Sequence, residues 1–212
     1  MTPDPINDRL AQQIAFLLEA DKLKTILRRT PITDTSRPEN SAEHSWHLVL
    51  AAIVLAERTA PVIDLLRVLE MLAVHDLVEI DAGDTFAYDA GHLDTKTERE
   101  RAAADRIFAL LPPDQGAQLR ARWEEFEAHE TPEARFANAL DRLQPLLQNA
   151  CAGGGSWSSH DVTRAQVFGR MEPIRTTMPD VWPHVVEIIE RFCASGVLRR
   201  DAAAPSPSGG KT

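Results

Sequence analysis

The decisive stretch of this sequence is Val74-His75-Asp76-Leu77-Val78-Glu79-Ile80-Asp81-Ala82-Gly83-Asp84. It follows an apolar run with helical spacing that begins near Leu65. His75 and Asp76 stand side by side at the end of that run, and Glu79 follows one helical turn after His75. Ionisable groups inside an apolar helix are costly unless they are paired or bind an ion. The stretch therefore predicts a buried helix that ends in a chemical site.

Helical spacing extends over nearly the whole chain, and no segment alternates with period two for long enough to predict a strand. Asn40 followed by Glu43 has the pattern of a capping box, and Thr131-Pro132-Glu133 has that of a helix start. We predict an all-α domain of about seven or eight helices. They are expected over about 7–28, 40–58, 61–79, 94–111, 113–130, 132 to the glycine turn at 153–155, 161–178 and 180–194.

Two packing expectations follow from these patterns. In the first helix, Leu10, Ile14, Leu17, Leu18 and Ile26 form an apolar stripe that we expect to be buried. The second helix is apolar nearly all round, which predicts a central position. Residues 83–93 and the two-proline segment 30–39 are expected to be irregular.

The length of 212 residues corresponds to one compact domain. We assign residues 1–198 to it and residues 199–212, rich in Ala, Pro, Ser and Gly, to a disordered tail. The net charge of −9 argues against a nucleic-acid polymer as partner, because phosphate backbones bind basic surfaces. No apolar run has the ~20 residues of a membrane span, and no basic signal-peptide segment opens the chain. Two cysteines fit a reducing cytoplasm.

Candidate metal ligands stand on three separate predicted helices: His44, the His75-Asp76 pair, and Asp141 on an otherwise apolar face. Imidazole and carboxylate together suit Mn²⁺, Co²⁺, Zn²⁺, Fe²⁺ or Mg²⁺. Each group also has a simpler explanation. His44 could be a core histidine, Asp76 a capping carboxylate beside a buried histidine, and Asp141 the partner of an arginine from another helix.

The order of these groups is that of a known family. The patterns Arg-x-Glu-Asn-x-x-Glu-His at Arg37–His44 and His-Asp-x-x-Glu-x-x-x-Gly-Asp at His75–Asp84, followed by Leu140-Asp141, resemble the HD-domain metal-dependent phosphohydrolases. More narrowly, they resemble the 5′-deoxynucleotidase (YfbR-like) branch, over roughly residues 10–150. The resemblance implies one HD-domain helical bundle, a homodimer, and one divalent metal ion held by His44, His75, Asp76 and Asp141.

The resemblance also implies catalytic and substrate-binding residues. Glu79 and Asp84 match the two catalytic carboxylates of the family. The family's phosphate anchor falls on Arg29 by an ungapped count, or on Arg28 with a shift of one residue, and both also fit cations at a helix C-terminus. Better-known members carry a tryptophan after this arginine, where this chain has Thr30. Two further candidates for substrate binding are Trp46 and Arg37.

We therefore expect a metal-dependent 5′-nucleotidase that releases phosphate from (deoxy)nucleoside 5′-monophosphates. The candidate residues fit the needs of this reaction. Phosphate ester hydrolysis needs an activated water, neutralised phosphoryl oxygens and a proton for the leaving alkoxide, and a metal ion with carboxylates can supply them. One alternative keeps the metal but hydrolyses a triphosphate or an alarmone. Such relatives usually carry more basic residues, and few stand around these motifs. Another alternative is a non-catalytic helical interaction module stabilised by a metal.

Overall fold

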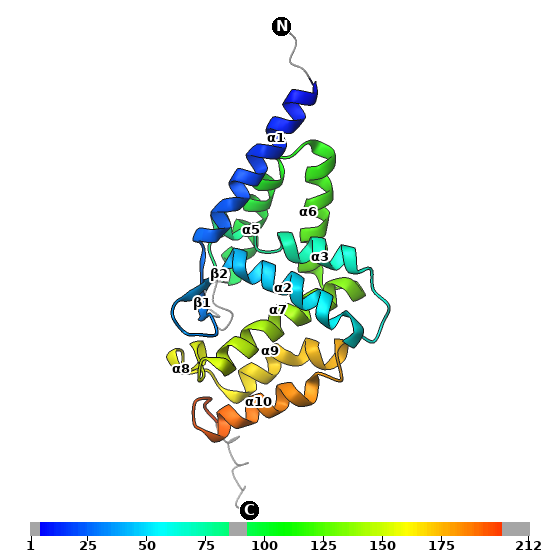
Figure 1. The fold of residues 1–212 in the computed structure, drawn as a ribbon. Helices are drawn as coiled ribbons and strands as arrows, with labels where there is room; N and C mark the ends of the chain where they lie inside the picture. Colours follow the sequence, from blue (N-terminus) through cyan, green and yellow to red (C-terminus); the bar gives the residue numbers. More distant parts are fainter. Residues whose placement is uncertain (1–4, 85–92, 201–212) are drawn as a thin grey trace, which may run out of the picture.

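The computed structural model describes residues 5–84 and 93–200, which form a helical bundle (Figure 1). Within these residues, eight helices have ten residues or more, in agreement with the predicted all-α class. They are α1 (Pro5–Ala20), α2 (Ser41–Leu55), α3 (Leu65–Val74), α5 (Leu93–Phe108), α6 (Pro113–Ala128), α7 (Pro132–Cys151), α9 (Arg164–Thr177) and α10 (Trp182–Ala194). Shorter elements are the one-turn helices α4 (Glu79–Ala82) and α8 (Ser156–Ser159), the 3₁₀ turns η1 (Asp21–Thr25) and η2 (Ala56–Arg58), and the strands β1 (Leu27–Pro31) and β2 (Pro38–Asn40).

The predicted helix starts at Asn40 and Thr131 are confirmed. The Asn40 side chain accepts a hydrogen bond from the Glu43 backbone, and the Glu43 side chain accepts one from the Asn40 backbone. Thr131 caps α7 by accepting from the Ala134 N–H. These contacts satisfy backbone groups that the first turn of a helix leaves unpaired.

The predicted end of the first helix is wrong. The helix ends at Ala20, η1 follows, and Arg28 and Arg29 lie on β1, which pairs antiparallel with β2. The chain turns back through the segment between Pro31 and Pro38, which allows this short pairing. Strands of five and three residues leave no visible period-two pattern in a sequence. The two arginines are therefore strand residues and not cations at a helix C-terminus.

The expected burial of the α1 stripe is also wrong for the chain described. Leu10, Ile14, Leu17 and Leu18 are 52%, 48%, 65% and 68% exposed. Figure 1 shows the reason, because α1 projects from one end of the bundle. Helical spacing identifies an apolar face but does not say which element covers it.

The expectation that α2 is central holds for one of its faces. Leu48 and Ala52 are fully buried on that face, whereas Leu50, Ile53 and Val54 on the opposite face are exposed. Helix α7 lies between α2 and α9 in Figure 1 and packs against both, as well as against α3 and α6. The largest group of buried apolar side chains surrounds α7, and a second group joins the end of α3 to α5 and α6.

The predicted helix 61–79 is shorter than expected. Helix α3 ends at Val74, and residues 75–78 form a tight turn before α4. In this turn the Leu77 N–H donates to the Val74 carbonyl, and the Glu79 N–H to the Asp76 carbonyl. Gly83 ends α4 with a φ of 76°, a conformation that favours glycine. The turn carries two of the predicted site residues, His75 and Asp76.

Two predicted irregular regions fall partly outside the described residues, namely 85–92 of the 83–93 segment and 201–212 of the tail. Arg199 at the start of that tail is held by backbone hydrogen bonds to Val162 and Arg164. Among the described helices, none combines the length and apolar character of a membrane span.

Candidate active site

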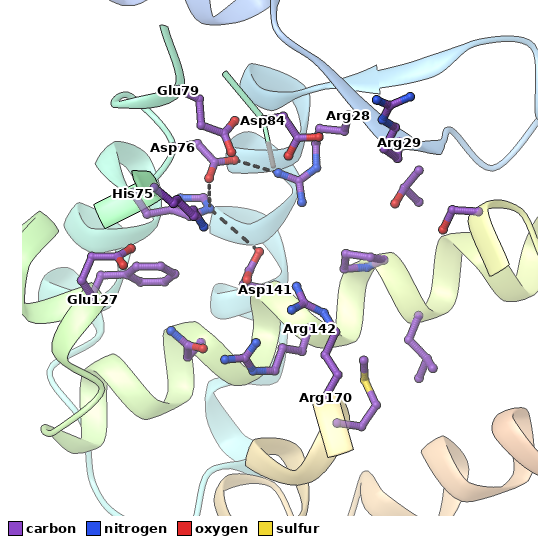
Figure 2. Close-up of a pocket in the computed structure, with 18 of the residues that line it drawn as sticks. Arg28, Arg29, His75, Asp76, Glu79, Asp84, Glu127, Asp141, Arg142 and Arg170 are labelled. Atoms are coloured by element: carbon purple, nitrogen blue, oxygen red, sulfur yellow. Dashed lines mark hydrogen bonds and ion pairs between the residues drawn. The ribbon is translucent and has the colours of Figure 1, made fainter. Parts of the chain in front are cut away.

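A cavity of about 270 Å³ opens between the 75–84 segment, β1 and the helices α6, α7 and α9. Figure 2 shows carboxylates and arginines converging on it from these elements. Its polar lining includes most of the predicted site residues: Arg28, Arg29, His75, Asp76, Glu79, Asp84 and Asp141. Residues far apart in sequence therefore meet in one place.

Three of the predicted metal ligands form a compact set. The nearest ligand atoms of His44, His75 and Asp141 lie within 4.8 Å of one another. His44 Nε2 is 2.9 Å from Asp141 Oδ1, and His75 Nε2 is 4.0 Å from the same oxygen. Asp76 lies beside this set, with Oδ1 3.1 Å from His75 Nε2. The groups come from α2, from the end of α3 and the following turn, and from α7.

The histidine His75 has the state that a metal ligand requires. Its Nδ1 lies 3.0 Å from the Leu72 carbonyl, which assigns the proton to Nδ1. Its Nε2 is buried and has no hydrogen-bond partner among the residues that the structure describes. Burial lowers the pKa of His75, against the attraction of Asp76 and Asp141. A neutral imidazole with an unused lone pair beside carboxylates fits a divalent cation.

The other histidine, His44, is paired with acids. Burial and the charge of Arg28 would lower its pKa, but the hydrogen bond to Asp141 and the Glu39 carboxylate at 3.5 Å outweigh them and raise that pKa to about 9. Burial would raise the pKa of Asp141, and the His44 contact holds it well below its usual range. Asp141 is therefore an ionised carboxylate whose partner is a histidine.

The candidate phosphate anchors differ in exposure. The Arg28 side chain is 11% exposed, and its Nη1 donates a hydrogen bond of 2.9 Å to Asp76 Oδ2. Arg29 lines the cavity from the same strand but is exposed. Burial would lower the pKa of Arg28, but Asp76, Asp141 and other carboxylates raise it above its usual value. Of the two arginines on β1, Arg28 is thus the one that contacts a candidate metal ligand.

The two other predicted substrate residues lie elsewhere. Trp46 is 66% exposed on the outer face of α2 and stacks on His47 with ring centroids 6.0 Å apart. Arg37 forms a two-point ion pair with Glu43 and also donates to the Pro38 carbonyl. Neither residue is among those that line the cavity in the described part of the chain.

The carboxylates of Glu79 and Asp84 complete the acidic wall of the cavity. Glu79 Oε2 accepts a hydrogen bond of 2.7 Å from the Ser41 hydroxyl. Burial and the neighbouring Asp76 raise the pKa of Glu79 well above its usual value. Burial also raises the pKa of Asp84, against the attraction of Arg28. Acids with raised pKa values in a cleft have the properties of proton-transfer groups.

Several residues of the site were not predicted. Phe126 packs against the His75 ring at 4.8 Å between centroids, and Arg142 and Arg170 line the cavity from α7 and α9 (Figure 2). Glu127 lies at the cavity rim, where desolvation and then Glu100 raise the pKa of its partly exposed carboxylate to about 7. No motif identifies these positions, since they follow from how the helices pack.

Buried polar residues behind His44 were also missed. Glu39, Gln144 and Gln148 are between 2% and 4% exposed and are joined by hydrogen bonds. The sequence did contain a signal for Glu39, because this residue is the first glutamate of the Arg37–His44 pattern.

The chain is similar to curated proteins named 5′-deoxynucleotidase HDDC2. The curated human protein 5′-deoxynucleotidase HDDC2 is 31% identical over 137 residues, which cover 62% of this chain and 66% of the human one. The mouse protein of the same name is 30% identical over 63% of this chain and 68% of its own length. This chain thus aligns with just under two thirds of the human relative.

The chain is also similar to solved structures. A predicted metal-dependent phosphohydrolase from Magnetospirillum magnetotacticum MS-1 is 50% identical, with a TM-score of 0.88 over 93% of this chain and 99% of that one. A Pyrococcus furiosus protein at 22% identity and TM-score 0.60 shares the fold over 85% of this chain and 99% of its own. A sequence profile described as HD domain matches residues 20–182. This chain belongs to the HD-domain family.

Proposed function

We propose that the protein is a metal-dependent phosphomonoesterase that removes phosphate from (deoxy)nucleoside 5′-monophosphates. One observation carries the proposal: Glu79 and Asp84 share a cavity with Arg28 and with three of the four metal-ligand candidates, namely His75, Asp76 and Asp141. A structural metal clamp needs neither acid. The relatives named 5′-deoxynucleotidases support the choice of substrate.

In this proposal His44, His75, Asp76 and Asp141 hold one divalent ion, with Mn²⁺, Co²⁺, Mg²⁺, Zn²⁺ and Fe²⁺ as candidates. The lone pair of His75 Nε2 and the ionised Asp141 fit such an ion. When bound, the ion supplies positive charge that polarises the phosphate and lowers the pKa of water.

The protein side chains supply the remaining chemistry. Arg28 binds the phosphate oxygens, and the exposed Arg29 assists at the entrance. Glu79 accepts a proton from the attacking water, because Ser41 holds its carboxylate at the cavity wall. Asp84 donates a proton to the leaving 5′-oxygen or holds the sugar hydroxyl. Burial raises the pKa values of both acids, as is usual for proton-transfer groups in an enzyme cleft.

A substrate with more than one phosphate is the second candidate, and one observation favours it. The cavity is lined by Arg28, Arg29, Lys96, Arg142 and Arg170, which is more basic than the motifs alone indicated. Product analysis separates the two candidates, because a monophosphatase releases inorganic phosphate and a triphosphohydrolase releases tripolyphosphate.

We further propose a homodimer in the cytoplasm. The exposed apolar stripe of α1 (Leu10, Ile14, Leu17 and Leu18) supports self-association, since monomers rarely leave such a surface open. Two free cysteines, one of them exposed, suit a reducing compartment. Sedimentation equilibrium, which measures the molecular mass in solution, tests the proposed homodimer.

The deciding experiment is a phosphate-release assay on a panel of ribo- and deoxyribonucleoside monophosphates with Mn²⁺ or Co²⁺ added. We expect turnover that chelation removes and that Glu79→Gln lowers by about 10²–10⁴-fold, the usual contribution of a general base. A metal-loaded wild type that releases no phosphate from any member of the panel overturns the proposal.

A further inference from the structure

Behind the metal-ligand candidates lies a buried carboxylate that the chemistry above does not use. Glu39 is the middle residue of β2, one position before the Asn40 cap of α2, and is 2% exposed. Its Oε1 accepts two hydrogen bonds from α7, at 2.7 Å from Gln144 Nε2 and at 2.6 Å from Gln148 Nε2. An ion this deeply buried is costly unless it is fully paired.

The second oxygen of Glu39 points to the functional groups. Oε2 lies 3.5 Å from His44 Nδ1 and 3.7 Å from Arg28 Nε. In the described residues both Glu39 Oε2 and Arg28 Nε are buried without a hydrogen-bond partner. Their separation of 3.7 Å is beyond hydrogen-bond length, so the two opposite charges attract each other without a hydrogen bond. Glu39 therefore lies between the candidate phosphate anchor and a candidate metal ligand.

The same network acts on the His44 ring. Gln144 Oε1 lies 3.1 Å from His44 Nδ1, while the Gln144 amide donates to Glu39. Because the NH₂ group of Gln144 donates to Glu39, the orientation of the amide is fixed and its carbonyl oxygen faces His44 Nδ1. A carbonyl oxygen can only accept a hydrogen bond. This assigns a proton to Nδ1 and directs Nε2 toward Asp141, to which the Nε2–H donates at 2.9 Å. A divalent ion beside Asp141 would replace that Nε2 proton and take up the lone pair. Such contacts behind a metal-binding histidine fix its orientation and increase its basicity.

From this geometry we infer that Glu39 is a positioning residue that orients His44 through Gln144 and holds Arg28 by charge, which links metal binding to phosphate binding. The phosphate half of this inference rests on the proposed function, whereas the metal half does not.

The test compares Glu39→Gln with the wild type. The amide replaces the carboxylate with nearly the same shape. If the oxygen of the new amide accepts from Gln144 and Gln148, its NH₂ group faces Arg28 Nε and His44 Nδ1. Both of these atoms are donors, so the amide cannot pair with either of them. We expect the Kd for Mn²⁺, measured by calorimetry without substrate, to rise about 10–100-fold, the usual effect of losing such a contact. The inhibition constant of inorganic phosphate should rise by a similar factor.

Three further variants control the experiment. Glu43→Gln alters the exposed carboxylate of the same motif, which pairs with Arg37, and should leave both constants unchanged. Glu39→Asp keeps the charge and should recover part of the metal affinity. Gln148→Met removes one donor to Glu39 and should weaken Mn²⁺ binding several-fold. If circular dichroism shows that Glu39→Gln is not folded, the Mn²⁺ affinity of Gln148→Met tests the inference in its place.

A spectroscopic measurement distinguishes an effect of Glu39 on the position of His44 from an effect on the stability of the whole protein. The visible spectrum of the Co²⁺-loaded protein reports the ligand geometry, and we expect it to change in Glu39→Gln but not in Glu43→Gln. Unchanged Mn²⁺ affinity and Co²⁺ spectrum in a folded Glu39→Gln protein overturn the inference. A wild type that binds Mn²⁺ but releases no phosphate overturns the proposed function and leaves the metal half standing.

Discussion

Arg28 and Asp76 form a hydrogen-bonded ion pair of 2.9 Å at the edge of the cavity, although they are 48 residues apart in sequence. A candidate phosphate anchor thus contacts a candidate metal ligand directly (Figure 2). The strand β1 makes this contact possible, because it carries Arg28 alongside the turn that follows α3. Substrate and metal are therefore expected to influence each other's binding through this pair.

The pair leads to a prediction about the two arginines of β1. Arg28→Gln should lower kcat/KM for a monophosphate substrate by about 10²–10³-fold, the usual loss for one preorganised donor to the reacting group. Arg29→Gln should lower it less than tenfold, because Arg29 is exposed. Steady-state phosphate release measures both variants, and a larger loss in Arg29→Gln would reassign the anchor.

Metal removal should be visible in stability. At about 100 times Kd, bound Mn²⁺ stabilises the protein by about 2.7 kcal/mol, or roughly 5–10 °C in Tm for a domain of this size. EDTA should remove this rise. In His75→Ala the rise should be absent, because the Nε2 lone pair is lost, whereas the exposed His184→Ala on α10 should keep it. Calorimetric scans of the three proteins with and without Mn²⁺ decide, and an intact rise in His75→Ala would contradict the ligand assignment.

The sequence predicted the helices and their caps because both depend on local spacing. Asn40 and Thr131 cap α2 and α7 as expected. It could not predict β1 and β2, since such short strands have no periodic signal, nor the exposure of the Leu17 side chain, which depends on what lies beside α1. Apolar spacing describes a helix face and not its neighbours.

The same division applies to the site. The 75–84 motif singled out His75, Asp76, Glu79 and Asp84, which all line the cavity. This was possible because these residues lie close together in the sequence, so their spacing is visible without the fold. Arg170 was not predicted, since it reaches the cavity from α9, 29 positions after Asp141 in the sequence. Glu39 was visible in a motif, but its role depends on two glutamines of α7 that only the fold brings to it.

Arg170 provides a prediction that the motifs did not. Arg170 lines the cavity, and its positive charge adds to those of His44 and His75 in holding the pKa of the buried Asp141 low. Arg170→Gln should lower kcat/KM by about 10–100-fold, the loss expected for one hydrogen bond to a charged group. The Kd for Mn²⁺ should not rise, because a cation near the site is removed. Arg175→Gln on the same helix, where Arg175 pairs with Glu172, is the matched control and should stay within twofold of the wild type. Equal kinetics in the two variants would exclude Arg170 from the site.

The raised pKa of Glu127 gives a pH prediction for the metal-free protein. Desolvation, followed by the charge of Glu100, raises this pKa from 4.5 to about 7. The folded state therefore holds a proton that the unfolded state has released, and the stability contributed below pH 4.5 is lost as the pH rises toward 7. Glu127→Gln does not titrate, so its Tm relative to the wild type should increase between pH 5 and pH 8. Because the carboxylate is partly exposed, we discount the effect to about 1 kcal/mol, or about 2–4 °C. Glu130→Gln, an exposed neighbour, should show no such trend. A constant Tm difference between Glu127→Gln and the wild type at the two pH values, measured in EDTA, would contradict the shift.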